Sequence, residues 1–307
     1  MKKILITGSA GFLGRTLARY FTRRGYQVYG IDRTHAENAP LIDLAEYVQS
    51  ELPSPLFGEV LKRWKPNAIL HCAGRASVTG AMQDPLSDFQ DGPALTSSLL
   101  DSVRMLDPDC AFILLSSAAV YGNPSTLPVS EKSTPNPVSS YGYHKLQSEI
   151  SCREYADLWG MRAASARIFS AYGAGLRRQV MWDIAHKALT QPEVRLQGTG
   201  QESRDFIHAQ DIARGLDVLL EKAPLGGEVY NLAGGRETAI ADLAQLILNQ
   251  LGHSIAPVFS GELPPGTPKQ WCADISKIRS LGFEPQVDLE QGVQSFVDWC
   301  RHEISGV

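Results

Sequence analysis

Short apolar runs alternate with helical patterns along the first half of the chain. Five runs have the length of buried strands, and they occupy residues 4–7, 27–31, 68–72, 111–116 and 163–169. Helical patterns cover residues 13–24, 93–105 and 141–159. A short third strand is expected to end at Asp43-Leu44. Strands that alternate with helices indicate parallel strands joined by crossover helices, so the pattern predicts an α/β fold.

The character of the sequence changes from Gly173 onward. The expected strands become short there, and glycine and proline become more frequent, as in Gly198-Thr199-Gly200. We therefore expect one part in residues 1–172, built on a parallel sheet to which some later residues also contribute. Residues 173–307 would form a smaller mixed lobe, interleaved with the first part.

The overall composition is that of an ordinary globular protein, with 43% hydrophobic and 20% charged residues. A net charge of −4 and scattered basic residues give little support to nucleic acid or a membrane surface as a partner. No stretch approaches the roughly 18 apolar residues that a membrane span needs. The five cysteines are widely spaced, which indicates reduced thiols in a cytoplasmic protein rather than a disulfide or zinc framework.

A glycine-rich segment lies between the first expected strand and the first expected helix. It has the spacing Gly-x-x-Gly-x-x-Gly at residues 8–14. Such glycines permit a tight turn, and the helix N-terminus behind them offers N–H groups and a partial positive charge to a pyrophosphate. Asp32 ends the second strand, where an acidic residue binds an adenosine ribose. These features predict a Rossmann-type doubly wound parallel sheet with a smaller mixed C-terminal substrate lobe.

The same segment indicates which dinucleotide would bind. Asp32 favours NAD, because its carboxylate repels the 2′-phosphate of NADP. Arg33 beside it could accept that phosphate, so NADP is the less favoured alternative. A glycine-rich turn that binds no cofactor is the third possibility.

Tyr141 and Lys145 lie four residues apart in an expected helix, which places them on one face. An ammonium beside a phenol favours the ionised phenol. The pair can therefore take a proton from a sugar or alcohol hydroxyl and return it. Tyr143 is only two residues from Lys145 and faces elsewhere. The spacing by itself is common, so a solvated helix surface is the alternative.

Further motifs accompany these two in a fixed order. They are His71-Cys72-Ala73-Gly74 and the segments 116–122, 167–173, 198–206 and 274–277. With the glycine segment and the Tyr141–Lys145 pair, the chain resembles the extended short-chain dehydrogenase/reductase family over nearly its whole length. Within that family it is similar to the NAD-dependent nucleotide-sugar epimerases and dehydratases, the group that includes UDP-glucose 4-epimerases.

The resemblance implies a cofactor site made from the glycine segment, several strand ends and one helix. The implied cofactor-binding residues are Gly8, Gly11, Phe12, Leu13, Gly14, Asp32, Arg33, Asp43, Leu44, Ala73, Gly74, Ser116, Tyr141 and Lys145. Asp43 and Leu44 would border the adenine, and Lys145 would bind the nicotinamide ribose. The implied catalytic set is Ser117, Tyr141 and Lys145.

The resemblance also implies a site for a nucleotide-diphosphate sugar, formed by Ser117, Tyr121, Ser170 and Arg204. Ser117 would hydrogen-bond the reacting sugar oxygen, and Arg204 would hold the diphosphate, to which a guanidinium binds in bidentate fashion. Each of three residues has a structural alternative. Ser117 could only end the fifth strand, Tyr121 could only pack, and Arg204 could only pair with Asp205. Ser170 stands where similar proteins often have Asn.

Two departures from the family pattern narrow the chemistry. Dehydratases and decarboxylases place acidic residues where this chain has Ala118 and Ala119, so water loss and decarboxylation are disfavoured. The favoured reaction is 4-epimerisation through a 4-keto sugar. The alternative is NAD(P)H-dependent reduction of a 4-keto-6-deoxy nucleotide sugar. A non-catalytic dinucleotide sensor is remote, because Ser117, Tyr141 and Lys145 are all present. No metal is expected.

The resemblance further implies a homodimer. Similar proteins pack two helices from each subunit into a four-helix bundle, and the corresponding segments here are residues 93–105 and 141–159. Leu95, Leu99 and Leu100 could form that contact, or they could be buried against the protein's own sheet.

Overall fold

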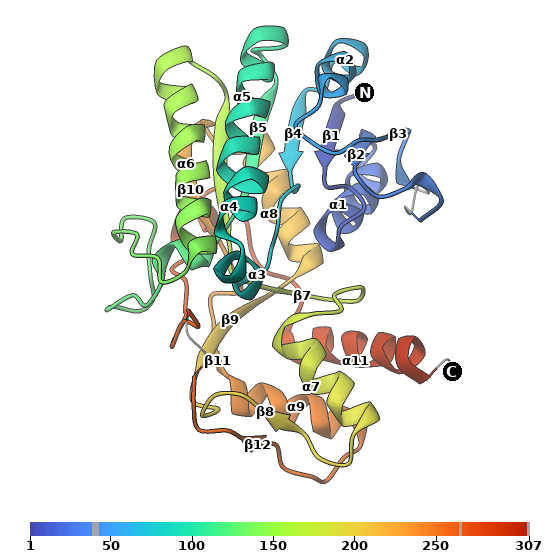
Figure 1. The fold of residues 1–307 in the computed structure, drawn as a ribbon, viewed down its shortest axis with the longest axis vertical. Helices are drawn as coiled ribbons and strands as arrows, with labels where there is room; N and C mark the ends of the chain where they lie inside the picture. The colour runs from blue at the N-terminus through green and yellow to red at the C-terminus, as the bar shows by residue number, and fades with distance from the viewer. Residues whose placement is uncertain (39–42, 264–265, 306–307) are drawn as a thin grey trace.

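A seven-stranded parallel sheet forms the larger part of the molecule in the computed structural model, which describes residues 1–38, 43–263 and 266–305 (Figure 1). Its strand order is β10-β6-β5-β4-β1-β2-β3. The strands are β1 (Lys3–Thr7), β2 (Gln27–Asp32), β3 (Glu46–Gln49), β4 (Ala68–His71), β5 (Ala111–Ser117), β6 (Ala163–Ile168) and β10 (Gly226–Leu232). The order reverses between β1 and β4, which opens a crevice at their carboxyl ends. The expected α/β class and doubly wound sheet are confirmed.

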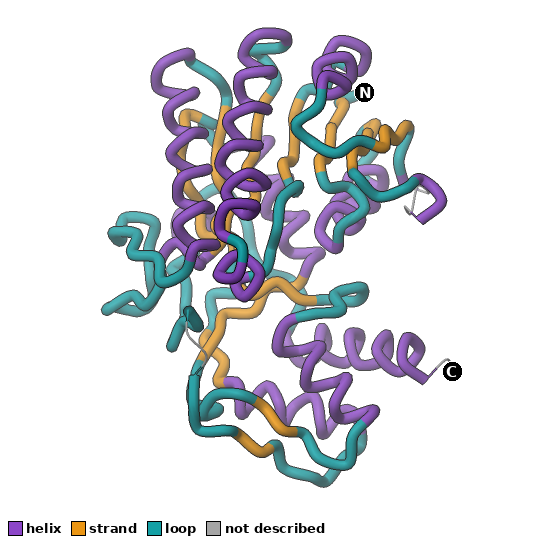
Figure 2. The backbone as a smooth tube through the Cα atoms, in the orientation of Figure 1, coloured by secondary structure: helices purple, strands orange, loops and turns teal. Residues whose placement is uncertain are grey.

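Helices cover both faces of this sheet (Figures 1 and 2). One face carries α1 (Phe12–Arg23) and α8 (Ala209–Lys222), and the other carries α2 (Pro55–Trp64), α5 (Leu95–Leu106) and α6 (Ser140–Trp159). In β1, Ile4 and Ile6 enter the core on the first face, whereas Leu5 enters the core on the second. Burial on both faces explains why the inner strands are apolar without alternation.

Shorter elements connect the strands at the crevice. The segment from β4 to α5 contains α3 (Val78–Gln83), α4 (Pro85–Phe89) and a π-helical turn, η3 (Gln90–Ala94). Two 3-10 turns, η1 (Ala36–Asn38) and η4 (Ala118–Tyr121), follow β2 and β5. The short helix α10 (Ser276–Arg279) contacts β10.

A smaller lobe lies below the carboxyl edge of the main sheet in Figure 1. It holds a mixed sheet of β7 (Ser170–Tyr172), β9 (Ser203–His208) and β11 (Glu237–Ala239), and a parallel pair of β8 (Arg195–Leu196) and β12 (Val258–Phe259). Around a separate apolar core pack α7 (Gln179–Thr190), α9 (Ile240–Leu251) and α11 (Leu289–Ser305). Although β10 and α8 come after the first elements of this lobe in sequence, they lie on the main sheet.

The third strand differs from the sequence-based expectation. The five other expected strands and the three expected helices agree with the structure within two residues at each end. β3, however, begins at Glu46, after the position where it was expected to end, so that prediction was wrong. In the part of the chain that the structure describes, β3 pairs only with β2, at the edge of the sheet, and none of its residues is fully buried. It therefore lacks the apolar run that marks the inner strands.

The sequence left open whether three leucines of α5 face a second subunit or the protein's own sheet. Leu95, Leu99 and Leu100 are buried in the core that α5 shares with α2 and β5, with 3%, 1% and 0% of their surface exposed. These leucines therefore stabilise the protein's own sheet. No helix in the described part of the chain is long and apolar enough to cross a membrane.

Candidate active site

A cavity of about 930 Å³ lies between the carboxyl edge of the main sheet and the smaller lobe. The main sheet contributes the glycine segment after β1, the ends of β2, β4 and β5, and the first turns of α6. The lobe contributes β7, the start of α7 and part of β9. Ligands of open α/β sheets bind at this place, where the strand order reverses. The volume is typical of small-molecule sites.

The glycine segment packs too closely for side chains. A Cβ added to Gly14 would overlap the carbonyl oxygen of Gly8, and Gly8 has a φ of 70°, which favours glycine. None of the described side chains caps α1, and its first turn holds no acidic residue. The free N–H groups of this turn adjoin the cavity, which Phe12 and Leu13 line. The turn therefore suits the pyrophosphate of a dinucleotide.

Asp32 stands on the cavity wall beside the glycine segment. One carboxylate oxygen accepts a hydrogen bond from Ala10 N–H at 3.0 Å, and the other accepts one from Thr34 N–H at 2.9 Å. These bonds hold the carboxylate at the end of β2. Arg33 follows on the same wall. Both residues therefore line the cavity close to the glycine segment.

His71 is buried behind the part of the cavity wall that Ala73 and Gly74 form. Its Nδ1 lies 2.7 Å from the Thr7 hydroxyl, which in turn accepts a hydrogen bond from Ala73 N–H at 3.2 Å. Burial, helped by the charge of Lys145, lowers the pKa of His71 to about 3. The imidazole is therefore neutral at physiological pH, and it holds Ala73 and Gly74 on the cavity surface.

Tyr141, Lys145 and Ser117 all line this cavity. α6 begins at Ser140 because the hydroxyl of Ser139 caps it, accepting a hydrogen bond from Gly142 N–H at 3.2 Å. Lys145 Nζ lies 5.8 Å from the centre of the Tyr141 ring and donates to the Leu115 carbonyl at 3.0 Å. The helix face that the spacing predicted therefore points into the cavity.

Two neighbouring serines end β5 and differ in their contacts. The hydroxyl of Ser117 accepts a hydrogen bond from Ala119 N–H at 3.2 Å, so it both ends the strand and faces the cavity. The hydroxyl of Ser116 donates to the buried carboxylate of Glu149 at 2.5 Å, although Ser116 also forms part of the cavity wall. The Ser116 side chain is therefore bound within the protein.

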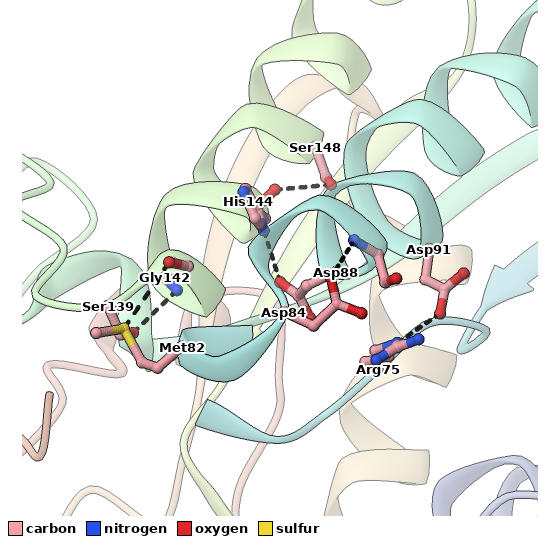
Figure 3. A network of polar contacts seen from close by, with 11 residues as sticks. Arg75, Met82, Asp84, Asp88, Asp91, Ser139, Gly142, His144 and Ser148 are labelled. Atoms are coloured by element: carbon pink, nitrogen blue, oxygen red, sulfur yellow. Dashed lines mark hydrogen bonds and ion pairs between the residues drawn. The ribbon is translucent and has the colours of Figure 1, made fainter. Parts of the chain in front are cut away.

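A polar network joins the first turns of α6 to the segment before α5 (Figure 3). His144 Nδ1 lies 2.6 Å from a carboxylate oxygen of Asp88 in α4, and both side chains are largely buried. Nearby, Arg75 donates to Asp91 at 2.8 Å. His144, to which the sequence assigned no task, therefore connects α6 to α4.

Arg204 reaches the cavity from β9. Its guanidinium lies 5.3 Å from the centre of the Trp271 ring and donates to the Ser203 carbonyl at 2.7 Å. Among the described residues, no carboxylate forms an ion pair with it, because Asp205 accepts the N–H groups of Gly234 and Ala273 instead. Burial lowers the pKa of Arg204 to about 10, so the side chain is still cationic at neutral pH. A cation in this setting suits an anionic ligand.

The structure does not bring three of the expected site residues to the cavity. Asp43 accepts a hydrogen bond from Arg19 at 3.4 Å, and Leu44 packs against the core. Tyr121 is 1% exposed, and its hydroxyl donates to Asn231 at 2.7 Å. Ser170, in contrast, lines the cavity as expected.

Other residues of the cavity were missed in the sequence. Ser50, Glu51 and Leu52 line it beyond the carboxyl end of β3. The sequence would have pointed to them if the third strand had been placed correctly, because ligands bind beyond the carboxyl ends of parallel strands. Trp271 and Arg178 also line the cavity. They come from distant loops, and no local pattern marked them.

Comparison with known proteins adds a family match. The NAD dependent epimerase/dehydratase family matches residues 4–233. The UDP-glucose 4-epimerase of Mycolicibacterium smegmatis is 27% identical, over 98% of this chain and 99% of that protein. The UDP-glucuronate 4-epimerase of Thermodesulfobacterium geofontis is 25% identical, over 98% of this chain and 96% of that protein.

A solved structure agrees closely with the fold. The UDP-glucuronic acid 4-epimerase of Bacillus cereus, in complex with UDP-glucuronic acid and NAD, superimposes with a TM-score of 0.90 at 27% identity. The match covers 98% of this chain and 99% of that one. The similarity therefore includes both the main sheet and the smaller lobe.

Proposed function

Because this chain belongs to the NAD-dependent epimerase/dehydratase family, we propose that it is a nucleotide-sugar 4-epimerase. It would oxidise the sugar at C4 and reduce the resulting ketone on its other face. The observation that carries the proposal is the placement of Ser117, Tyr141 and Lys145 on the wall of the cavity that the glycine segment also lines. The names of similar proteins support UDP-sugars as the substrate class.

In this reaction Tyr141 takes the proton of the sugar 4-hydroxyl and later returns it to the same oxygen. Lys145 places a positive charge on the same helix face, 5.8 Å from the centre of the Tyr141 ring. Ser117 hydrogen-bonds the reacting oxygen from the end of β5. NAD, when bound, supplies the acceptor and donor of the hydride. The protein must therefore keep the keto sugar within the cavity until the sugar has rotated and presents its other face to the cofactor.

The residues after Ser117 support epimerisation over dehydration. Ala118 and Ala119 are buried, with 0% and 5% of their surface exposed, and their methyl groups cannot transfer a proton. On the lobe side, Arg204 and Ser170 are proposed to bind the substrate, with Arg204 at the diphosphate.

The proposed cofactor is NAD rather than NADP. The carboxylate of Asp32 stands on the wall at the end of β2, where it would repel a 2′-phosphate. The cavity-lining residues proposed to hold the cofactor are Gly8, Gly11, Phe12, Leu13, Gly14, Asp32, Arg33, Ala73, Gly74, Ser116, Tyr141 and Lys145.

Incubation with UDP-, dTDP- and GDP-sugars in the absence of added cofactor tests the proposal. We expect NAD to be released from the denatured protein and two 4-epimers to interconvert in at least one sugar pair. If turnover required added NAD(P)H and occurred only with a 4-keto-6-deoxy sugar, the protein would be a reductase and the proposal would be wrong.

A Tyr141→Phe variant tests the proton transfer. It should lower kcat by about 1,000-fold, because a positioned acid and base contributes on this scale. NAD binding should remain, since all the other residues proposed to hold the cofactor are unchanged. Tyr143→Phe is the matched control, because Tyr143 lies on the same helix but is 51% exposed. Activity of the Tyr141→Phe enzyme close to that of the control would refute the role of Tyr141.

We also propose that the protein is a cytoplasmic homodimer. The described cysteines are all free thiols, which suits a reducing compartment. Three apolar side chains lie exposed along one side of α6, at intervals of seven and eight residues: Tyr143, Ile150 and Leu158. Such a row on an outer helix suits the same helix of a second copy.

A further inference from the structure

The helix that carries Tyr141 and Lys145 has an unusual inner face. Its fully buried residues are Gly142, Ser148, Glu149 and Cys152. None of them is a large apolar residue, whereas Ile150, Leu158 and Trp159 are exposed. Leu146 and Tyr155 add only partly buried contacts to the core. Apolar contact is not directional, so it would fix the position of α6 along its axis only weakly.

Glu149 makes the most specific contact of this face. Arg167 Nε donates to one carboxylate oxygen at 3.0 Å, and Arg167 Nη2 donates to the other at 2.7 Å. Both side chains of this bidentate ion pair are 4% exposed. The Ser116 hydroxyl adds a third hydrogen bond, and the guanidinium lies 4.7 Å from the centre of the Tyr121 ring. The carboxylate is therefore held by three donors from two strands.

Glu149 and Ser116 lie close in sequence to the proposed catalytic residues, Glu149 on α6 and Ser116 on β5. Glu149 lies one turn after Lys145 on the same face of α6. Ser116 precedes Ser117 on β5, and Arg167 lies opposite Ser116 in the register of β5 and β6. Lys145 also contacts β5, through the Leu115 carbonyl. The end of β5 that holds Ser117 is therefore bonded to α6 at two neighbouring residues. Leu115 accepts from Lys145, and Ser116 donates to Glu149.

We propose that Glu149 and Arg167 are positioning residues: their ion pair sets α6 against β5 and thereby places Tyr141 relative to Ser117. The inference rests on the proposed epimerase function. A buried ion pair adds little net stability, because both charges lose their hydration. Its planar fork, however, tolerates little displacement. A catalytic group displaced by about 1 Å can lose about 100-fold in rate.

Two variants separate position from stability. The double variant Glu149→Leu/Arg167→Met removes both charges and keeps apolar volume, so it should stay folded. The single variant Arg167→Lys keeps the charge but loses the fork. We expect kcat to fall about 100-fold in the double variant and about tenfold in the single variant. KM for the nucleotide sugar and the affinity for NAD should change by less than about threefold, because the glycine segment, Asp32 and Arg204 lie outside α6 and are unchanged.

Two controls show what a purely structural change does. Ser148→Ala alters a buried residue of the same helix, whose hydroxyl bonds, among the described residues, only to the His144 carbonyl of its own helix. Asp217→Asn alters a buried carboxylate that pairs with Arg24 at 3.0 Å, between α8 and α1 and outside the cavity. Both should lower the melting temperature at most and leave kcat within about twofold of the wild type.

Amide hydrogen exchange in residues 142–147 supplies a readout that needs no substrate. At equal global stability, these amides should exchange faster in Arg167→Lys than in Asp217→Asn. If kcat and exchange in Arg167→Lys matched the controls, the inference would be overturned, whether or not the double variant folds. If the wild type converted no nucleotide sugar, the proposed function would fail instead, and the exchange rates would still decide whether Arg167 positions α6.

Discussion

Single residues in this protein take their roles from what their side chains contact. Ser116 and Ser117 are adjacent and chemically identical, yet the first donates to buried Glu149 and the second faces the cavity. Arg204 and Asp205 are also adjacent, and the expected alternative was an ion pair between them. Asp205 instead binds backbone N–H groups, which leaves the cation of Arg204 to the cavity.

His71 provides a prediction at this scale. Its pKa is about 3 in the folded protein and 6.5 in an ordinary environment, so only the unfolded chain binds a proton between these values. Its contribution to stability is therefore complete above pH 6.5 and is lost as the pH falls toward 3. From neutral pH to pH about 5, the free energy of unfolding should decrease by about 2 kcal/mol more in the wild type than in His71→Gln. Urea unfolding at both pH values measures this difference, and equal decreases would contradict it.

At the scale of elements, the close approach of α6 to η4 decides where Tyr141 lies. A Cβ at Gly142 would be 2.5 Å from the carbonyl oxygen of Ala119. Only glycine therefore lets the helix come this near to the turn that follows Ser117. The sequence indicated the helix and the Tyr141–Lys145 face correctly, because both follow from a local period. It did not indicate this contact, because residues 119 and 142 meet only in the folded chain.

A Gly142→Ala variant tests this contact. The added methyl group meets backbone and cannot be accommodated by a side-chain rotation, so α6 must move away from η4. We expect a loss of about 1–3 kcal/mol in the free energy of unfolding. We also expect a clear fall in kcat. Gly58→Ala in α2 is the control, because among the described residues the new methyl group there meets only the flexible end of Leu106, the last residue of α5. An unchanged kcat and stability in Gly142→Ala would contradict the expectation.

At the scale of the whole molecule, the cavity exists only because two parts meet. The main sheet supplies the proposed cofactor residues and Tyr141, whereas the lobe supplies Arg204 and Ser170. The chain leaves the main sheet after β6 and returns to it at β10, so neither part is a separate length of sequence. The outer side of α6 meanwhile leaves a row of apolar side chains exposed.

The proposed dimer gives the prediction at this scale. Ile150 and Leu158 are 58% and 67% exposed on α6, and charges at both positions should prevent burial against a second copy. Light scattering should give the mass of a dimer for the wild type and of a monomer for Ile150→Glu/Leu158→Glu. Ile255→Glu, at a position 36% exposed in the smaller lobe, should stay dimeric. A monomeric wild type, or a double variant that stays dimeric, would disprove the contact.

The sequence by itself determined the inner strands and their helices, the glycine segment and the Tyr141–Lys145 face, because each depends on a period or spacing within a few residues. The alternation of strands and helices predicted the parallel sheet, and Asp32 was correctly placed at the end of the second strand. It misplaced β3, an edge strand with little burial, and with it the contribution of Ser50 and its neighbours to the cavity. Only the tertiary structure decided that Tyr121 packs, that Glu149 meets Arg167, and that Trp271 lies beside Arg204. These are contacts between residues far apart in sequence, and they form only when strands, turns and loops are brought together by folding.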